Sequence, residues 1–148
     1  MLSIDTNIVF PASQSAAPLH DRARTWLESL SERNDVVLSE LMLADVYGLL
    51  RNPVIQPRPL SAPAAATIIK AYRRHPRWRI VGFPPEGRRM HDALWEKAAE
   101  PGLAYRRFYD LRLAISLQHQ GVDEFATINV KDFQSLGFRR VWNPLAEK

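Results

Sequence analysis

Three aspartates that stand beside apolar runs are the residues with the most chemical potential. Asp5 follows the short, mainly apolar run at 2–4 and comes directly before Thr6 and Asn7. Asp45 lies within a second apolar run, and Asp110 stands ahead of a third. Mg²⁺ and Mn²⁺ prefer such oxygen ligands, and they keep bound waters that can be activated to attack phosphorus. Together these acids would suit metal-assisted hydrolysis of a phosphodiester.

Two acids on one predicted helix compete for the same role. Ser39 can cap a helix over residues 39–50 that carries Glu40 and Asp45. Five residues of an α-helix turn through roughly 140°, so the two carboxylates cannot face one site. Glu40 has an ordinary role beside the helix dipole. Asp45 has apolar neighbours, where a lone carboxylate is costly unless it is paired or metal-bound, so Asp45 is the stronger candidate.

A fourth polar segment follows a predicted strand near the end of the chain. It offers Thr127, Asn129 and Asp132. Each segment also has a structural explanation, because aspartate, asparagine and threonine are common turn residues and helix-start residues. Only the set of segments as a whole favours a site.

The residues that are absent narrow the chemistry further. The chain has no cysteine, which excludes disulfides, thiolate nucleophiles and cysteine-based zinc sites. The four histidines are scattered without the spacing of metal ligands. Any metal should therefore be a hard ion with oxygen ligands.

Basic residues are concentrated in the middle of the chain. Residues 51–107 hold 12 basic and 4 acidic residues, a net charge of +8 within a chain of net charge +4. Such a segment can attract the phosphates of a nucleic acid, although a merely solvated face would have the same composition. The bases are Arg51, Arg58, Lys70, Arg73, Arg74, Arg77, Arg79, Arg88, Arg89, Lys97, Arg106 and Arg107.

The predicted elements alternate between strands and helices along one domain that spans residues 1–148. Long helical crossovers between strands are typical of a parallel sheet, so the fold class is α/β. Ligands bind such sheets beyond the carboxyl ends of the strands, where Asp5 lies. The predicted strands are 2–5, 36–38, 78–82, 124–128 and 139–142, and the predicted helices are 18–32, 39–50, 61–74, 87–99 and 107–120, with a helical turn at 131–136.

The expected location is the cytoplasm. No run approaches the 18 or more apolar residues of a membrane span, and the first residues carry no basic leader. Among the tryptophans, Trp26 and Trp95 occupy apolar helical positions and are expected in the core. Trp78 stands between two arginines, where it could stack on a base.

The order of these motifs resembles the PIN-domain family, in particular its VapC-type toxins, over nearly the whole chain. The resemblance implies a three-layer α/β/α sandwich around a mostly parallel five-stranded sheet. It also implies a Mg²⁺- or Mn²⁺-dependent endoribonuclease, homodimers and inhibition by a VapB-like antitoxin. The motifs are Ile-Asp-Thr-Asn at 4–7, Leu-Ala-Asp-Val-Tyr at 43–47, Leu-Leu-Arg-Asn-Pro at 49–53, Tyr-Asp-Leu-Arg-Leu-Ala at 109–114 and Phe-Ala-Thr-Ile-Asn-Val-Lys-Asp-Phe at 125–133.

By position, Asp5, Asp45 and Asp110 match the three family acids that hold the metal. The family more often has Glu at the position of Asp45 and an acid at that of Asn129, so either Asn129 or Asp132 completes the catalytic set. Thr6, Asn7 and Thr127 are expected to orient ligands or phosphate. The arginines expected to hold RNA are Arg51, Arg73, Arg77 and Arg112, and Arg112 could instead support the acids.

Three alternatives stay open at this point. A PIN-fold protein could bind RNA without cutting it. A phosphatase could use Asp5 as its nucleophile, although Asn7 occupies the place where such enzymes usually have a second acid. A purely structural partner protein would leave the acids unexplained.

Overall fold

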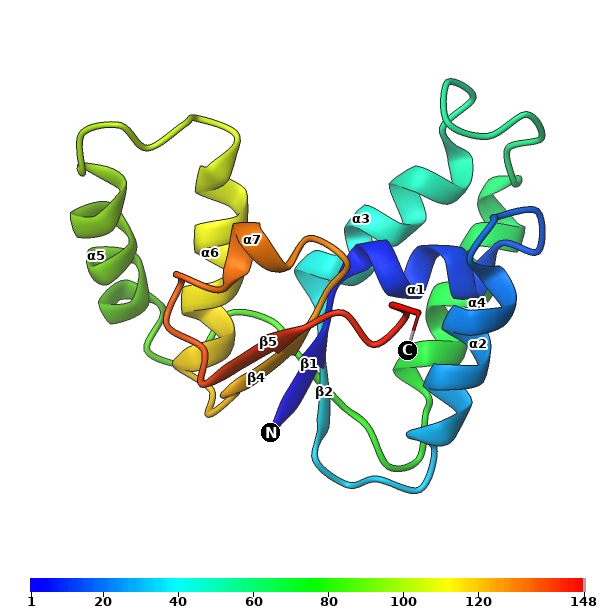
Figure 1. Cartoon of the computed structure of the whole chain (residues 1–148), viewed down its shortest axis with the longest axis horizontal. Helices are drawn as coiled ribbons and strands as arrows, with labels where there is room; N and C mark the ends of the chain where they lie inside the picture. The colour runs from blue at the N-terminus through cyan, green and yellow to red at the C-terminus, as the bar shows by residue number, and fades with distance from the viewer. Residues whose placement is uncertain (148) are drawn as a thin grey trace.

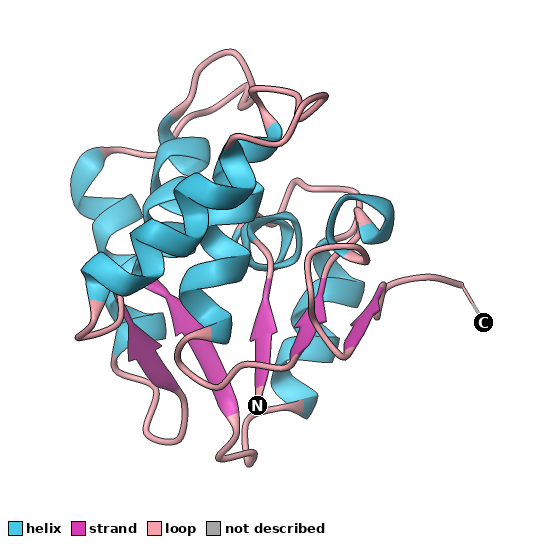
Figure 2. Cartoon of the chain, turned by 90° about the vertical axis from the view of Figure 1, so that its left-hand side faces the viewer, coloured by secondary structure: helices cyan, strands magenta, loops and turns pink. Residues whose placement is uncertain are grey.

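The central sheet of the computed structural model, which describes residues 1–147, is parallel throughout. Its five strands lie in the order β3-β2-β1-β4-β5, and all four pairings are parallel. Figure 2 shows the strands running side by side in one direction. The predicted α/β class is confirmed. The strands are β1 (Leu2–Ile4), β2 (Val36–Ser39), β3 (Arg79–Val81), β4 (Glu124–Ala126) and β5 (Arg140–Trp142).

Helices cover both faces of this sheet, which makes the three expected layers (Figure 1). Helices α1 to α4 pack with Leu2, Ile4 and Leu38 on one face, and α6 and α7 pack with Val37 and Phe125 on the other. Helix α5 packs on α6. The helices are α1 (Thr6–Ser13), α2 (His20–Ser29), α3 (Glu40–Arg51), α4 (Ala62–Arg73), α5 (Gly87–Ala98), α6 (Arg107–Gln118) and α7 (Val130–Phe133).

Local sequence signals explain where several helices start and stop. The hydroxyl of Ser39 accepts a hydrogen bond from the Leu41 amide, so Ser39 caps its helix as predicted, and Ser61 does the same for Ala64. After α6, Gly121 has a φ of +87°, the left-handed conformation that glycine adopts without a steric penalty.

Helix α1 was not predicted. Its sequence, Thr-Asn-Ile-Val-Phe-Pro-Ala-Ser, is rich in β-branched residues and holds Pro11 inside the helix, so its intrinsic helix propensity is low. The helix forms because Ile8 and Val9 are completely buried against the sheet. Tertiary packing therefore overrides propensity, and it fixes Thr6 and Asn7 in the first helical turn after β1.

Sheet topology selects one place for a ligand. The chain builds the sheet outward from β1 in one direction through β2 and β3, and then in the other through β4 and β5. Ligands of doubly wound sheets bind where this direction reverses, outside the carboxyl ends of the strands. The reversal lies between β1 and β4, which the Asp5 amide joins by donating to the Ala126 carbonyl over 2.9 Å.

The tryptophan predictions have different outcomes. Trp26 packs against the core, and Trp78 is buried with its indole N–H donating to the Leu30 carbonyl, so Trp78 has no free face for a base. The prediction for Trp95 is wrong, because this side chain is 61% exposed. Helix α5 buries Met90 and its other inward-facing residues on α6, which turns Trp95 outward. No helix within residues 1–147 has the length and apolar character of a membrane span.

Candidate active site

An open cleft of about 560 Å³ lies where the topology places a ligand. Its polar lining comes from the end of β1, the start of α1, the exposed side of α3, the start of α6 and the loop after β4. The predicted site residues in this lining are Asp5, Thr6, Asn7, Asp45, Asp110 and Asn129.

A smaller cavity of about 120 Å³ brings the three predicted acids together. Asp5, Asp45 and Asp110 all line it, although 40 and 65 residues of chain separate them. Arg112 borders the same cavity, as its alternative role beside the acids predicts. Acidic residues from three separate parts of the chain therefore line one small cavity.

Asp5 is the most deeply buried of these acids, with 8% of its surface exposed. The Thr127 hydroxyl donates to Asp5 Oδ2 over 2.6 Å. Burial raises the pKa of Asp5 from 3.8 to about 6, against the lowering effect of the Thr127 hydrogen bond, and the charges of Asp110 and Asp45 raise it further. Asp5 is thus an electrostatically costly carboxylate at neutral pH.

Thr127 is the centre of a hydrogen-bond network that holds Asp5 in place. The hydroxyl gives its proton to Asp5 and accepts hydrogen bonds from Asn7 Nδ2 at 3.1 Å and the Asn129 amide at 3.0 Å. One donor and two acceptor positions are all that a hydroxyl offers. Asn7 Oδ1 also accepts from the Ile128 amide at 3.2 Å, so Asn7 fastens α1 to the loop after β4.

The environment of Asp45 differs from the one that the sequence predicted. The sequence pattern predicted an apolar setting, but Asp45 and Ala44 are both exposed on the side of α3 that borders the cleft. The apolar neighbours Leu43 and Val46 turn toward the core instead. The protein around Asp45 still raises its pKa by desolvation, while the charge of Arg112 lowers it.

Asp110 belongs to a chain of charges that runs away from the cavity. Arg107 Nε lies 3.8 Å from Asp110 Oδ2, and Arg107 Nη1 lies 3.9 Å from Asp132 Oδ1. The guanidinium also donates to the Asp132 carbonyl. Desolvation raises the pKa of Asp110 against the lowering effect of Arg107, and the charges of Asp132 and Asp45 raise it further.

The two candidates for the fourth position lie in different places. Asn129 is exposed and lines the cleft, whereas Asp132 lines neither the cleft nor the inner cavity. Asp132 contacts Arg107, which lies next to Asp110, and its charge raises the pKa of Asp110. The sequence analysis counted Arg107 among the basic residues of the middle segment and did not place it in the site. No sequence signal distinguishes an arginine that lies between two acids from any other arginine in the first turn of a helix.

Three of the four arginines predicted to hold RNA line neither the acidic cleft nor the inner cavity. Arg51 bonds within its own helix, while Arg73 forms an ion pair with Glu40 at 2.8 Å. Arg77 pairs with Glu32 at 3.2 Å and precedes β3, so it lies at the opposite edge of the sheet from Asp5. A direct role of these arginines at the cleft has no geometric support.

The acids do not form a finished metal cage. Within residues 1–147, no group of three histidine, cysteine, aspartate or glutamate side chains stands ready to hold a metal ion. The inner cavity instead offers separated carboxylate oxygens around a small space.

The chain is similar to known proteins over almost its full length. It is 45% identical to the protein named ribonuclease VapC24 of Mycobacterium tuberculosis strain H37Rv over 145 residues, which covers 98% of this chain and 97% of that protein. The same identity and coverage hold for VapC24 of strain CDC 1551. No protein-family model matches the chain.

Solved structures share its fold at much lower identity. VapC20 of M. tuberculosis, described as a sarcin-ricin loop cleaving toxin, has a TM-score of 0.68 at 17% identity, covering 93% of this chain and 96% of that one. FitAcB of Neisseria gonorrhoeae has a TM-score of 0.64 at 20% identity, covering 99% and 100%. VapBC2 of Rickettsia felis has 0.61 at 19% identity, covering 96% and 97%.

The parallel sheet and the acidic cleft at its point of reversal define a PIN-type α/β protein. The full-length similarity to VapC24 goes further than the fold. The chain belongs to the VapC family of ribonuclease toxins. Membership in this family favours a ribonuclease over the phosphatase and structural-protein alternatives.

Proposed function

We propose that the chain hydrolyses RNA phosphodiesters within the RNA strand, in its acidic cleft, with the help of Mg²⁺ or Mn²⁺. One observation carries the proposal, namely that Asp5, Asp45 and Asp110 line the same small cavity. Desolvation raises the pKa of all three carboxyl groups. The negative charges of Asp110 and Asp45 raise the pKa of Asp5 further. A bound cation would offset this repulsion, because an opposite charge nearby favours ionised carboxylates.

The donor atoms fit such an ion. The cavity offers carboxylate oxygens and no sulfur or imidazole, which suits a hard divalent cation. Mg²⁺ is commonly bound by only one or two carboxylates, together with waters and substrate phosphates, so a finished cage is not required. Asp5, Asp45 and Asp110 would hold the ion, with Asn129 as a further oxygen donor at the rim of the cleft.

A bound ion supplies a water of lowered pKa and positive charge against the scissile phosphate. The residues of the chain orient the reaction. Thr127 fixes one oxygen of Asp5, which sets the direction of this carboxylate. Arg112 lines the inner cavity, and its positive charge would offset negative charge on the phosphate. Arg107 lies within 4 Å of both Asp110 and Asp132, where its positive charge favours the ionised form of Asp110.

An antitoxin partner is the second part of the proposal. FitAB and VapBC2 were solved as assemblies bound to DNA, and VapBC2 was bound to a fragment of its promoter. We expect a small VapB-like protein to bind this chain and suppress cleavage. Coexpression with the product of an adjacent short reading frame should abolish the activity of the purified pair. Light scattering of the chain alone tests the predicted homodimer.

The direct test is cleavage of total bacterial RNA by purified, antitoxin-free protein with Mn²⁺ or with a chelator. The wild type should give discrete products with Mn²⁺ and none with the chelator. Asp5→Asn should give none in either buffer. Asp123→Asn is the matched control, because it removes an acid at the opposite edge of the sheet and should cut like the wild type. Absence of cleavage by folded, metal-loaded wild type would support the RNA-binding alternative instead.

A further inference from the structure

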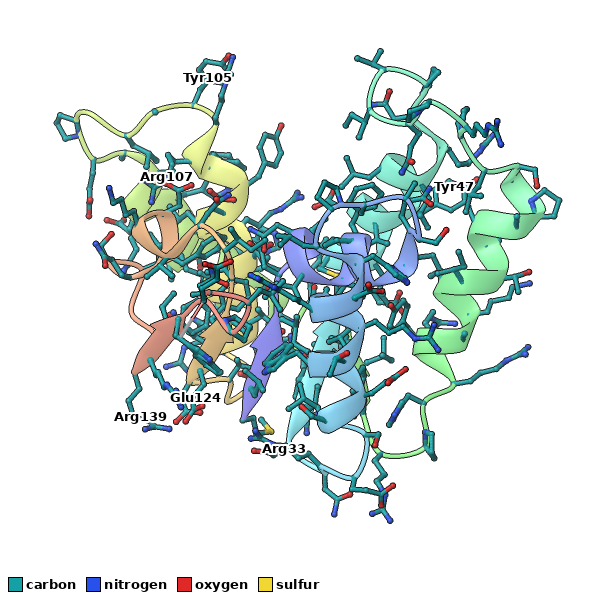
Figure 3. The ribbon with its side chains drawn as sticks, turned by 45° about the vertical axis from the view of Figure 1, so that its right-hand side comes forward. Arg33, Tyr47, Tyr105, Arg107, Glu124 and Arg139 are labelled. Atoms are coloured by element: carbon teal, nitrogen blue, oxygen red, sulfur yellow. The ribbon has the colours of Figure 1, made fainter. Side chains whose placement is uncertain are left out.

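Four aromatic side chains gather where the last turn of α5 meets the start of α6. These residues, the aromatic patch, are Trp95, Tyr105, Phe108 and Tyr109. Trp95 is 61% exposed, Tyr105 77% and Tyr109 62%. Figure 3 shows Tyr105 at the outer end of this part of the molecule, with Arg107 further inward. Rings of this size usually turn inward, so their exposure together needs an explanation.

The patch forms an ordered surface. The ring centroids of Trp95 and Phe108 lie 5.1 Å apart with 29° between their planes, and Tyr109 meets Phe108 edge-on at 5.6 Å. Together with Ala98 and Leu103 these rings line an open pocket of about 430 Å³. Three of the four rings belong to helices, and the Phe108 contact holds them to one another. These three rings could therefore receive a flat base without first being ordered, while Tyr105 is contributed by the loop before α6.

Guanidinium groups lie beside these rings. Arg106 lies over the Tyr105 ring at 5.6 Å from its centroid and donates to the Tyr105 hydroxyl. Arg112 lies over the Tyr109 ring at 5.4 Å. Positive charge interleaved with aromatic faces is the combination that binds single-stranded nucleic acid, since phosphates meet the cations and bases meet the rings.

The patch is continuous with the acidic site. Tyr109 lines both the patch pocket and the inner cavity, and the next residue is Asp110. Arg112 borders the inner cavity while it covers Tyr109. A strand with one phosphate at the acids would thus carry its neighbouring bases directly onto the rings.

We propose that the aromatic patch is a base-stacking subsite that holds unpaired bases of the RNA next to the scissile phosphate. The proposal deepens the nuclease function and rests on it. The subsite takes unpaired bases, because bases paired in a duplex cannot present their faces to the rings. Stacking tolerates any base, so the patch should favour unpaired structure more than a particular sequence.

The test is a binding measurement that does not depend on cleavage. All proteins carry Asp5→Asn and are kept in chelator. Two fluorescent probes of equal length are compared by anisotropy at one salt concentration, a short oligoadenylate and an abasic oligomer with the same phosphates. Trp95→Leu and Tyr105→Leu remove a ring but keep an apolar side chain, whereas Trp95→Phe and Tyr105→Phe keep a ring. Both positions are exposed, so the folded core should not change.

The Asp5→Asn protein without a substitution in the patch, the parent, should bind oligoadenylate about tenfold more tightly than the abasic probe. The leucine variants should lose most of that preference at unchanged abasic affinity, and the phenylalanine variants should keep it. Equal binding of both probes by the parent, or full preference in the leucine variants, would overturn the proposal. Leucine variants that keep the preference but alter self-association or antitoxin binding would make the patch a protein interface.

The cleavage assay separates failure of this proposal from failure of the function. If the wild type cuts RNA but shows no preference for bases, only the stacking subsite is wrong. If the base preference depends on the rings while no Mn²⁺-dependent cleavage occurs, the nuclease proposal is wrong and the patch belongs to an RNA-binding protein.

Discussion

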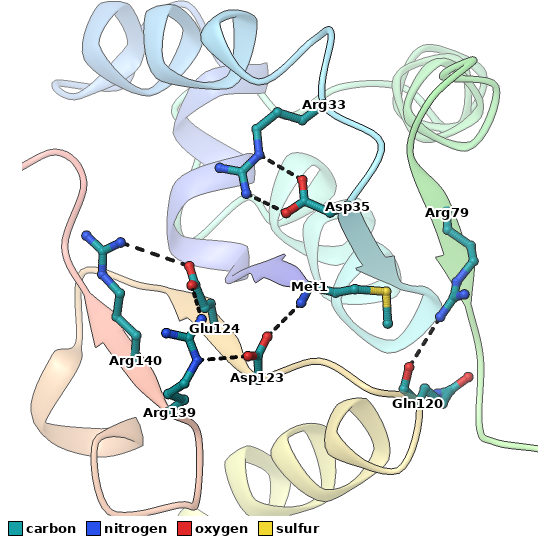
Figure 4. Close-up of polar contacts among 9 residues, drawn as sticks. All are labelled: Met1, Arg33, Asp35, Arg79, Gln120, Asp123, Glu124, Arg139 and Arg140. Atoms are coloured by element: carbon teal, nitrogen blue, oxygen red, sulfur yellow. Dashed lines mark hydrogen bonds and ion pairs between the residues drawn. The ribbon is translucent and has the colours of Figure 1, made fainter.

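Acidic side chains gather at both edges of the parallel sheet, but their partners differ. At the amino edge each carboxylate meets a cation within hydrogen-bond distance (Figure 4). Arg33 donates to both oxygens of Asp35 at 2.8 and 2.6 Å, and Asp123 accepts from the N-terminal amino group at 2.6 Å and from Arg139 at 2.9 Å. These hydrogen bonds lower the pKa of Asp35 and lower that of Asp123 to about 2.

At the carboxyl edge, Glu40 pairs with Arg73 at 2.8 Å, but the described part of the chain gives Asp5, Asp45 and Asp110 no cation within hydrogen-bond distance. The nearest atoms of Arg107 and Asp110 are 3.8 Å apart, beyond hydrogen-bond distance. Asp5 has a threonine hydroxyl as its side-chain partner, and burial raises its pKa to about 6. Pairing therefore serves stability at one edge, while the other edge keeps negative charge available. That difference is the reason why we propose a cation site at the carboxyl edge.

The largest expected effect separates the two edges by activity. Asp110→Asn should lower the RNA cleavage rate by about 10²- to 10³-fold, the usual cost of removing one group that stabilises the transition state electrostatically. Asp35→Asn removes an acid from the other edge and should leave the rate within about twofold. Single-turnover cleavage with saturating Mn²⁺ measures both. Equal losses in the two variants would abolish the distinction between the edges.

The second effect concerns pH and stability without metal. The raised pKa means that folded Asp5 keeps its proton up to about pH 6, whereas the unfolded chain loses it near 3.8. This stabilising contribution is complete below about pH 4 and is lost as pH rises through 6. At pH 7, Asp5→Asn should exceed the wild type in unfolding free energy by up to about 3 kcal/mol. Urea unfolding at pH 4 and pH 7, in chelator, checks whether the advantage grows with pH.

Loss of the Thr127 hydroxyl should have a slightly smaller effect on stability. Thr127→Val leaves Asp5, Asn7 and the Asn129 amide without their shared partner, which should lower the unfolding free energy by about 1–3 kcal/mol. The lost hydrogen bond should also raise the pKa of Asp5 further. Thr127→Ser keeps the hydroxyl and should cleave RNA faster than Thr127→Val. A valine variant as active as the serine variant would rule out a positioning role.

The smallest effect is expected at the amino edge. Asp123→Asn removes the exposed partner of Arg139 and of the N-terminal amino group. The lowered pKa of Asp123 means that its stabilising contribution is present above pH 4 and is lost as pH falls through about 2. At pH 7 the variant should melt slightly lower, and added salt should shrink the difference. A difference that grows with salt would contradict an ion pair.

The sequence predicted most of this arrangement because its signals are local. The Ser39 cap and the apolar runs marked the strands and the helices predicted at 39–50 and 61–74. The sequence did not reveal α1, whose helix depends on tertiary burial of Ile8 and Val9. It also misplaced Trp95, since its outward direction follows from how α5 packs on α6.

The site was predictable as a set of residues but not as a network. Strand ends and family motifs identified Asp5, Asp45 and Asp110, and the structure brings them to one cavity. No sequence pattern specifies that Thr127 donates to Asp5 or that Arg107 lies between two acids. Such contacts depend on elements that are far apart in the chain, so only the folded geometry contains them.

Direct measurement of Mn²⁺ binding tests the contrast between the edges most simply. Electron paramagnetic resonance of free Mn²⁺ at pH 7 would compare the wild type, Asp5→Asn and Asp123→Asn, without RNA. We predict that the wild type and Asp123→Asn bind Mn²⁺ with the same affinity and that Asp5→Asn loses binding. Equal binding by all three proteins, or loss in Asp123→Asn alone, would contradict a metal site at the carboxyl edge.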